Sequence, residues 1–194
     1  MLSFSITGQN SNLEFGVKGG LNYSTYQNGF PLFEFERSLG YFVGGYGNIS
    51  INDNFKFQTE ILFANQGTDY KIDYTGIILP QNPEELTFNE NLNGKVEELT
   101  IVVPILAQYY FSKKFYIELG PQFGFIINRK EIINGKSIES DNYDSFDFGI
   151  SPGIGLLLTE KIGISAKYLV GIIERDSEIK SSVLNLGISY KIGQ

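Results

Sequence analysis

The chain of 194 residues contains no cysteine, no histidine and no tryptophan. Without cysteine it has no disulfide, no thiolate metal site and no thiol nucleophile. Without histidine it lacks the commonest general base and metal ligand, and every catalytic triad that uses an imidazole. We therefore expect no catalytic residue, no cofactor, no metal site and no enzymatic activity.

Long apolar runs and an excess of basic charge are also missing. No run approaches the roughly 20 apolar residues that a membrane-spanning helix needs, which excludes helical spans only. The formal net charge is −7. A surface of this sign repels a phosphate backbone, so we expect no nucleic-acid partner.

Aromatic residues and glycine are abundant instead, with 16 Phe, 12 Tyr and 22 Gly. This composition, without runs of helix formers, favours an all-β fold. The length suits one domain with a substantial core. We expect residues 14–194 to form a single β-barrel domain, and residues 1–13 to be an N-terminal tail or a signal-peptide remnant.

The clearest pattern is a hairpin from Phe146 to Ile173, in which apolar and small polar residues alternate strictly on both sides of a Thr159-Glu160-Lys161 turn. Alternation of period two over arms this long predicts β-strands. One face is apolar and the other is mostly Gly and Ser. The apolar face carries Phe146, Phe148, Ile150, Pro152, Ile154, Leu156 and Leu158 on the first arm, and Ile162, Ile164, Ala166, Tyr168, Val170 and Ile172 on the second.

Further strands are expected at about residues 14–27, 37–50, 55–70, 96–111 and 115–128, and after Lys180. The pattern leaves open which face of 37–50 is apolar. Short turns alternate with longer connections, of which Lys71 to Lys95 is the longest irregular segment and Arg129 to Tyr143 is a second polar loop. This alternation predicts an eight-stranded antiparallel up-and-down transmembrane β-barrel.

Two architectures share this alternation. A soluble calycin-like or lipocalin-like barrel places its apolar face inside, around an apolar ligand, and a membrane barrel inverts the faces. Gly, Ser, Asn and Gln dominate the polar face here, and small residues suit the narrow interior of a small barrel. The apolar face is nearly free of charge, as lipid requires. We therefore favour the membrane barrel and keep the soluble barrel as the alternative.

A few charged residues fall on the face that would line the barrel. Buried charges must be paired or hydrated, so we expect a polar network that fills the lumen. An open ion path is disfavoured because a barrel of this size leaves no aqueous channel. The expected network contains Lys18, Lys56, Glu60, Glu118, Lys167 and Lys191.

Adjacent carboxylates at Glu97-Glu98 do not indicate acid–base chemistry, because neighbours on a strand point to opposite faces. We interpret them, and Glu84-Glu85, as solvated charge. The other acidic residues of the long connections favour solubility over a divalent-cation site.

Several short stretches resemble the PorT-like outer-membrane β-barrel family common in Bacteroidota. The resemblance rests on Gly16 to Asn22, Leu99 to Phe111, Gly120-Pro121, and Asp147-Phe148-Gly149 with Gly153 and Gly155. It implies an eight-stranded barrel that is exported through a signal peptide to the bacterial outer membrane. The family has no common catalytic residues to carry over.

These patterns together predict a small bacterial outer-membrane protein with a side-chain-filled lumen. Its role would be structural or based on recognition by the loops, without catalysis. The expected partners are outer-membrane lipid and an unknown ligand or protein at the loop of residues 71–95. We expect the short turns and both termini on the periplasmic side.

Overall fold

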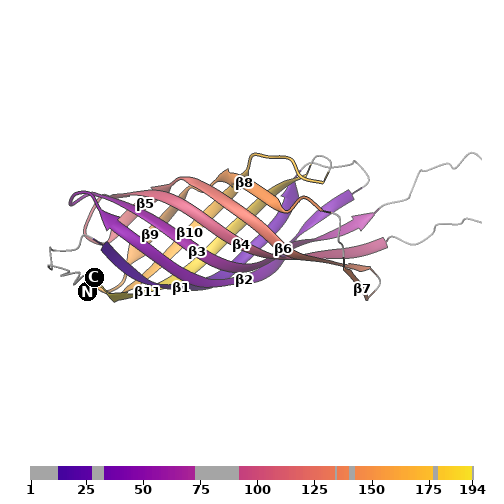
Figure 1. Cartoon of the computed structure of the whole chain (residues 1–194), viewed down its shortest axis with the longest axis horizontal. Helices are drawn as coiled ribbons and strands as arrows, with labels where there is room; N and C mark the ends of the chain where they lie inside the picture. Colours follow the sequence, from indigo (N-terminus) through magenta and orange to yellow (C-terminus); the bar gives the residue numbers. More distant parts are fainter. Residues whose placement is uncertain are drawn as a thin grey trace, which may run out of the picture.

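The computed structural model describes residues 13–27, 33–72, 92–133, 135–139, 143–176 and 179–193. These residues form one sheet, shown in Figure 1. No helix in these ranges is long and apolar enough to span a membrane. The eleven strands are β1 (Leu13–Gln27), β2 (Phe33–Ser50), β3 (Phe55–Ile72), β4 (Leu92–Tyr110), β5 (Phe115–Leu119), β6 (Pro121–Ile133), β7 (Lys136–Glu139), β8 (Phe146–Ile150), β9 (Gly153–Leu157), β10 (Ile162–Gly171) and β11 (Lys180–Gly193).

The sheet closes on itself, and every pairing in it is antiparallel. Strand β1 pairs with β2 on one side and with β11 on the other. Strand β11 also pairs with β10, which pairs with β8 and β9, and these two pair with β6 and β5. The predicted all-β antiparallel barrel is confirmed.

The number of strands differs from the expected eight because two expected strands are interrupted at proline. The strand expected at 115–128 divides into β5 and β6 at Gly120, immediately before Pro121, and the first arm of the hairpin divides into β8 and β9 at Ser151-Pro152. Proline has no N–H to donate to the ladder. Ladder contact continues across these interruptions, since Ser151 N donates to Gly120 O at 2.9 Å. The short strand β7 accounts for the remaining difference.

Three short turns, at residues 51–54, 111–114 and 158–161, lie at the same end of the barrel as the start of β1 and the end of β11 (Figure 1). Each turn is closed by the side-chain oxygen of its second residue, which accepts hydrogen bonds from two backbone N–H groups further along. Asn, Ser and Thr make such local bonds readily, which is why the chain reverses there. The accepting atoms are Asn52 Oδ1, Ser112 Oγ and Thr159 Oγ1, at 2.9–3.3 Å from their donors.

The opposite end carries an extension that was expected to be irregular. Strand β3 runs on to Ile72, β4 already begins at Leu92, and β6 continues to Ile133, so both ends of the expected loop 71–95 and much of the expected loop 129–143 are strand. The middle of the first loop, residues 73–91, lies outside the described residues. The pairing of β1 with β2 ends at Ser24 and Ser38, whereas β2, β3, β4, β6 and β7 stay paired beyond that point.

We call this extension the projecting sheet; it comprises residues 33–37, 68–72, 92–98, 129–133 and 136–139, and it extends past the ends of the other strands in Figure 1. A hydrophobic cluster of Tyr26, Tyr70, Val96 and Ile179 supports its base. Charged and polar residues surround these few apolar positions in the sequence. For this reason the sequence suggested loops in these segments, although the inward side chains pack together in the structure.

The two faces of the barrel wall differ sharply in chemistry. Large apolar side chains cover the outside; for example, Leu39 is 67% and Ile61 58% exposed. The inside holds charge, with Lys18 at 3% and Glu60 at 1% exposure. On β2, the strand whose faces the sequence left open, Phe42 is buried inside at 3%. A soluble carrier needs the opposite arrangement, so the calycin-like alternative is not supported.

The effect of a charged substitution should distinguish the apolar belt, which is the lipid-facing outer surface of the ring, from the projecting sheet. We expect Ile61→Lys, in the middle of β3, to lower the free energy of unfolding by about 2–4 kcal/mol in lipid vesicles, because the ammonium group would lie in hydrocarbon. Ile138→Lys in β7 is the matched control, since Ile138 is 56% exposed against 58% for Ile61. Urea unfolding measures both. Equal losses for the two variants would contradict this assignment of the belt.

Candidate functional site

The centre of the lumen is organised around one carboxylate, Glu60 on the inner face of β3. Lys18 Nζ on β1 lies 2.8 Å from Glu60 Oε1, and Lys167 Nζ on β10 lies 2.6 Å from Glu60 Oε2. All three side chains are at most 2% exposed. Gln58 Nε2 also donates to Glu60 Oε1 at 2.7 Å. The carboxylate therefore cross-links three strands from different parts of the ring.

Glycines on the inner face leave space for the long lysine side chains. A Cβ on Gly187 would lie 3.2 Å from Lys18 Cε, and a Cβ on Gly153 would lie 2.7 Å from Lys167 Cγ. Larger residues at these positions would displace the ammonium groups from Glu60. This packing explains physically why the face opposite the apolar one is rich in glycine.

An amide network continues from Glu60 toward the end that carries the short turns. Gln108 Nε2 donates to Glu118 Oε2 at 2.9 Å and to Gln58 Oε1 at 3.1 Å. Asn48 Nδ2 donates to Gln58 Oε1 at 3.2 Å and to Gln108 Oε1 at 3.1 Å. Glu118 is thus held by an amide rather than directly by a lysine.

A second charged group lies at the end of the lumen near the short turns. Glu14 Oε2 accepts from Lys56 Nζ at 3.1 Å, and Glu14 Oε1 accepts from Lys191 Nζ at 3.4 Å. The Lys56 ammonium group also lies 5.2 Å from the centre of the Tyr110 ring. The six residues expected in the lumen therefore divide into a buried set around Glu60 and a half-buried pair on Glu14. Glu14 itself was missed, because it stands at the start of the first strand.

A third charged group lies inside the end of the barrel from which the projecting sheet extends, and we call this end the mouth. Arg175 is 2% exposed, and its two terminal nitrogens each lie 3.3 Å from one oxygen of Glu98. Its Nη2 also donates to Ser181 Oγ at 3.1 Å, and its guanidinium carbon lies 5.5 Å from the centre of the Tyr26 ring. Glu98 was expected to be solvated, and that expectation is wrong: it is 3% exposed. Bidentate pairing with arginine offsets the cost of its burial.

The segment that carries Arg175 is fastened to the neighbouring connection. Asp176 N donates to Asp144 Oδ2, and Asp144 N donates to Asp176 Oδ1, both at 2.9 Å. The Asp176 carboxylate also pairs with Arg129. Asp176 has a φ of 44°, a left-handed conformation that aspartate tolerates better than most residues. No sequence pattern indicated this group, because Arg129 begins an expected polar loop and Arg175 lies just beyond the expected hairpin.

Apolar layers alternate with these charged groups along the barrel. Phe42, Leu62, Ala64 and Val102 form a cluster that follows Glu60 along the inner face of β3. Tyr26, Tyr70, Val96 and Ile179 form the second cluster at the mouth. Within the described ranges no three acidic residues come close enough together to hold a metal ion. The arrangement is suited to mechanical cross-linking of the wall.

Comparison with known proteins gives a consistent result. A family described as outer membrane protein beta-barrel domain matches residues 7–175 of the chain. No curated protein sequence matches. Among solved structures, the Neisserial surface protein A aligns with a TM-score of 0.57 at 14% identity, covering 92% of this chain and 97% of that one.

Two further solved structures are similar. The attachment invasion locus protein Ail of Yersinia pestis aligns with a TM-score of 0.50 at 14% identity, covering 92% of this chain and 98% of that one. The outer membrane protein OprG from Pseudomonas aeruginosa aligns with a TM-score of 0.51 at 12% identity, covering 93% and 96%. At such low identity these structures show the fold alone.

Removal of the central carboxylate should expose the cost of burying two lysines. We expect Glu60→Leu to lower the free energy of unfolding by roughly 3–5 kcal/mol, because Lys18 and Lys167 would remain buried without their counter-charge. The control is the triple variant Lys18→Met, Glu60→Leu, Lys167→Met, which removes all three charges and should recover most of this loss. Denaturant unfolding in detergent measures both. An unchanged free energy of unfolding for Glu60→Leu would contradict a structural role for the carboxylate.

Proposed function

The chain belongs to the family of outer membrane protein β-barrel domains and resides in the bacterial outer membrane, and from this premise we propose that it is a closed, non-catalytic barrel that recognises a partner outside the cell. Its wall anchors the protein in lipid. Its lumen holds the wall rigid. The projecting sheet and the connection between β3 and β4 present the recognition surface.

The observation that carries this proposal is the asymmetry of the two ends. Three turns of four residues close one end, whereas β2, β3, β4, β6 and β7 continue as the projecting sheet at the other. Outer-membrane barrels carry short turns on the periplasmic side and longer segments outside the cell. The projecting sheet then stands in the external medium, where a binding surface is useful.

The edge of this sheet offers a specific mode of recognition. Residues 33–37 of β2 pair with β3 but with no other strand in the described part of the chain. An open edge presents backbone N–H and C=O groups that an extended segment of a partner protein can pair with. The expected loop of residues 71–95 begins in β3 and ends in β4, its middle lies outside the described residues, and we include it in the proposed recognition surface.

The layers of the lumen support a closed barrel rather than a channel. The ring has eight strand positions if the interrupted pairs β5–β6 and β8–β9 each count as one strand and β7 is left out. A barrel of eight strands has an interior that side chains fill. The groups around Glu60, Glu14 and Arg175, together with the two apolar clusters, occupy successive levels of that interior. Within its family we assign the chain to the PorT-like, Bacteroidota type, on the short stretches noted in the sequence.

Conductance tests the closed lumen. We expect the protein reconstituted into a planar lipid bilayer to show no steady single-channel current in molar potassium chloride, because charged and apolar layers block the interior. An empty bilayer serves as the reference for the measurement. A reproducible current that disappears when the protein is omitted would contradict the closed barrel.

Labelling of single cysteines tests the orientation, since the chain contains no cysteine of its own. Ile138→Cys lies in the projecting sheet and Ile51→Cys in a short turn, and the two native side chains are 56% and 58% exposed. We expect a membrane-impermeant maleimide to label position 138 in intact cells and position 51 only after the outer membrane is permeabilised. The reverse pattern would place the projecting sheet in the periplasm and overturn the proposed recognition role.

A further inference from the structure

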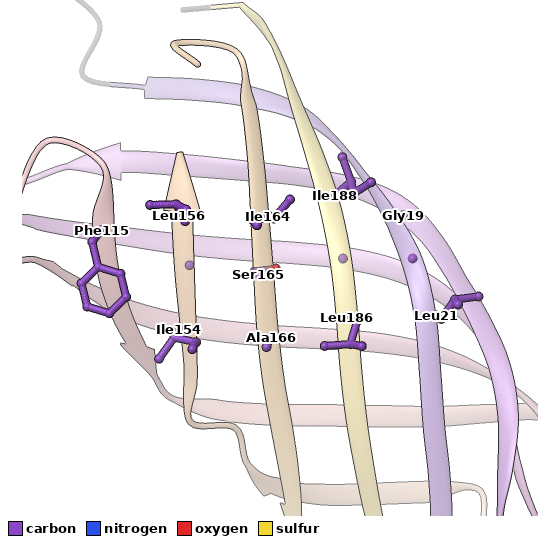
Figure 2. A pocket seen from close by; sticks show the side chains of 13 residues that line it. Gly19, Leu21, Phe115, Ile154, Leu156, Ile164, Ser165, Ala166, Leu186 and Ile188 are labelled. Atoms are coloured by element: carbon purple, nitrogen blue, oxygen red, sulfur yellow. The ribbon is translucent and has the colours of Figure 1, made fainter. Parts of the chain in front are cut away.

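The outer wall carries an apolar groove of about 640 Å³ where β5, β9, β10, β11 and β1 lie side by side (Figure 2). Two rows of outward side chains cross these strands. The row nearer the short turns runs through Phe115, Leu156, Ile164, Ile188 and Gly19, which pair in register with one another. The adjacent row includes Ile154, Ala166, Leu186 and Leu21.

The groove exists because two positions in these rows are small. Ala166 lies between Ile154 and Leu186, and Gly19 lies beside Ile188 (Figure 2). The small residues therefore form the floor of the groove, and the larger neighbours form its sides, which we call its banks. The bank residues are strongly exposed, with Ile154 at 52% and Leu186 at 53%. A hollow in an apolar surface loses dispersion contacts unless something fills it.

The location of the groove in the membrane indicates what kind of molecule occupies it. The groove lies within the belt of apolar side chains, where the surrounding medium is hydrocarbon. A flexible acyl chain can follow an irregular floor, and each methylene that it buries there contributes to binding.

Charge at one end of the groove indicates which lipid supplies the chain. Phe115 directly follows the turn that contains Lys113 and Lys114, both exposed and neither in an ion pair with any described residue. Lys114 O accepts a hydrogen bond from Leu157 N at 2.7 Å, which holds this turn against β9, the strand of Leu156. The neighbouring turn carries Lys161 beside Glu160, so the two turns together bear an excess of two positive charges.

We propose that this groove is a binding site for an anionic glycerophospholipid. One acyl chain lies over Ala166 and Gly19, and the phosphate group lies at Lys113 and Lys114. The site requires only that the barrel is embedded in a bilayer, so it goes beyond the proposed recognition role and does not depend on it.

A second copy of the chain fits the groove less well. A two-fold dimer in a membrane packs the same patch of both copies together with the same ends in the same leaflet. The lysine-bearing turns of both copies would then lie close together, and their like charges would oppose the contact.

Fluorescence can test the site cleanly because the chain contains no tryptophan. Phe115→Trp places a single reporter at the charged end of the groove. The matched control is Phe55→Trp: Phe55 also begins a strand directly after a four-residue turn, but that turn carries Asp53 and no lysine. Each variant is reconstituted into vesicles of phosphatidylcholine mixed with phosphatidylglycerol, with bromine on the acyl chains of one lipid at a time. Because both leaflets are identical, the orientation of the barrel does not affect the result.

We expect bromine on phosphatidylglycerol to quench Phe115→Trp with a relative association constant about fivefold or more above that for phosphatidylcholine, since a lysine near a membrane surface contributes about 1 kcal/mol toward anionic lipid. Phe55→Trp should give a ratio near one. Adding Lys113→Gln and Lys114→Gln to Phe115→Trp should bring its ratio close to one. Adding Ala166→Leu, which fills the floor of the groove, should lower the ratio at least twofold while the lysines remain. An acyl chain that is no longer seated in the groove would not hold its phosphate group at Lys113 and Lys114.

Four results would each overturn the proposal. Equal quenching of Phe115→Trp by both lipids would show no lipid preference. A preference that survives loss of both lysines would show that they do not bind the phosphate. A preference unchanged by Ala166→Leu would show that the groove takes no part. Absence of quenching by either lipid, together with a cross-linked dimer, would show that a second copy fills the groove.

Discussion

Closure of the backbone hydrogen-bond ladder is the constraint on which the rest of the structure depends. In hydrocarbon an unpaired N–H or C=O group has no water to bind, so a sheet that spans a membrane must have no free edge. The pairing of β1 with both β2 and β11 closes the ring. Even the interruptions at Pro121 and Pro152 keep contact across the gap, through bonds such as that from Tyr168 N to Pro152 O at 2.9 Å. In the described part of the chain, residues 33–37 of β2 pair on one side alone, and they lie in the projecting sheet, beyond the ring.

Closure also creates a narrow interior whose contents must satisfy one another. The chain places lysines, carboxylates and amides there, and it keeps glycines such as Gly153 and Gly187 where long side chains need room. Glu60 joins strands β1, β3 and β10 through two ion pairs. Arg175 performs a similar task near the mouth, where it ties the segment before β11 to Glu98 on β4. Such pairs are sensitive to the loss of one partner, so they favour one packing of the wall over others.

The two ends of the barrel follow different physical rules. At the end with the short turns, a side chain in each turn accepts hydrogen bonds from the backbone, and aromatic pairs such as Phe111 with Phe115 pack at the edge of the apolar belt. At the other end, the strands of the projecting sheet leave the ring on one side only. Its base is supported by the cluster around Tyr70 and Val96, which is far smaller than the apolar belt. A rigid wall therefore carries a sheet with open edges, a combination suited to presenting a binding surface.

The sequence alone determined the faces of the wall except on β2, because alternation of period two fixes which side chains share a side. The apolar positions of the hairpin, such as Ile154 and Ile164, could be assigned outward from this pattern, and Lys18 and Glu60 inward. Tertiary structure decided everything that depends on distance across the ring. Alternation does not show that Lys167 meets Glu60, since 107 residues separate them. Nor does it reveal the burial of Glu98 or the strand character of residues 92–95 and 129–133. Those segments look like polar loops because their charges are paired only when distant strands come together.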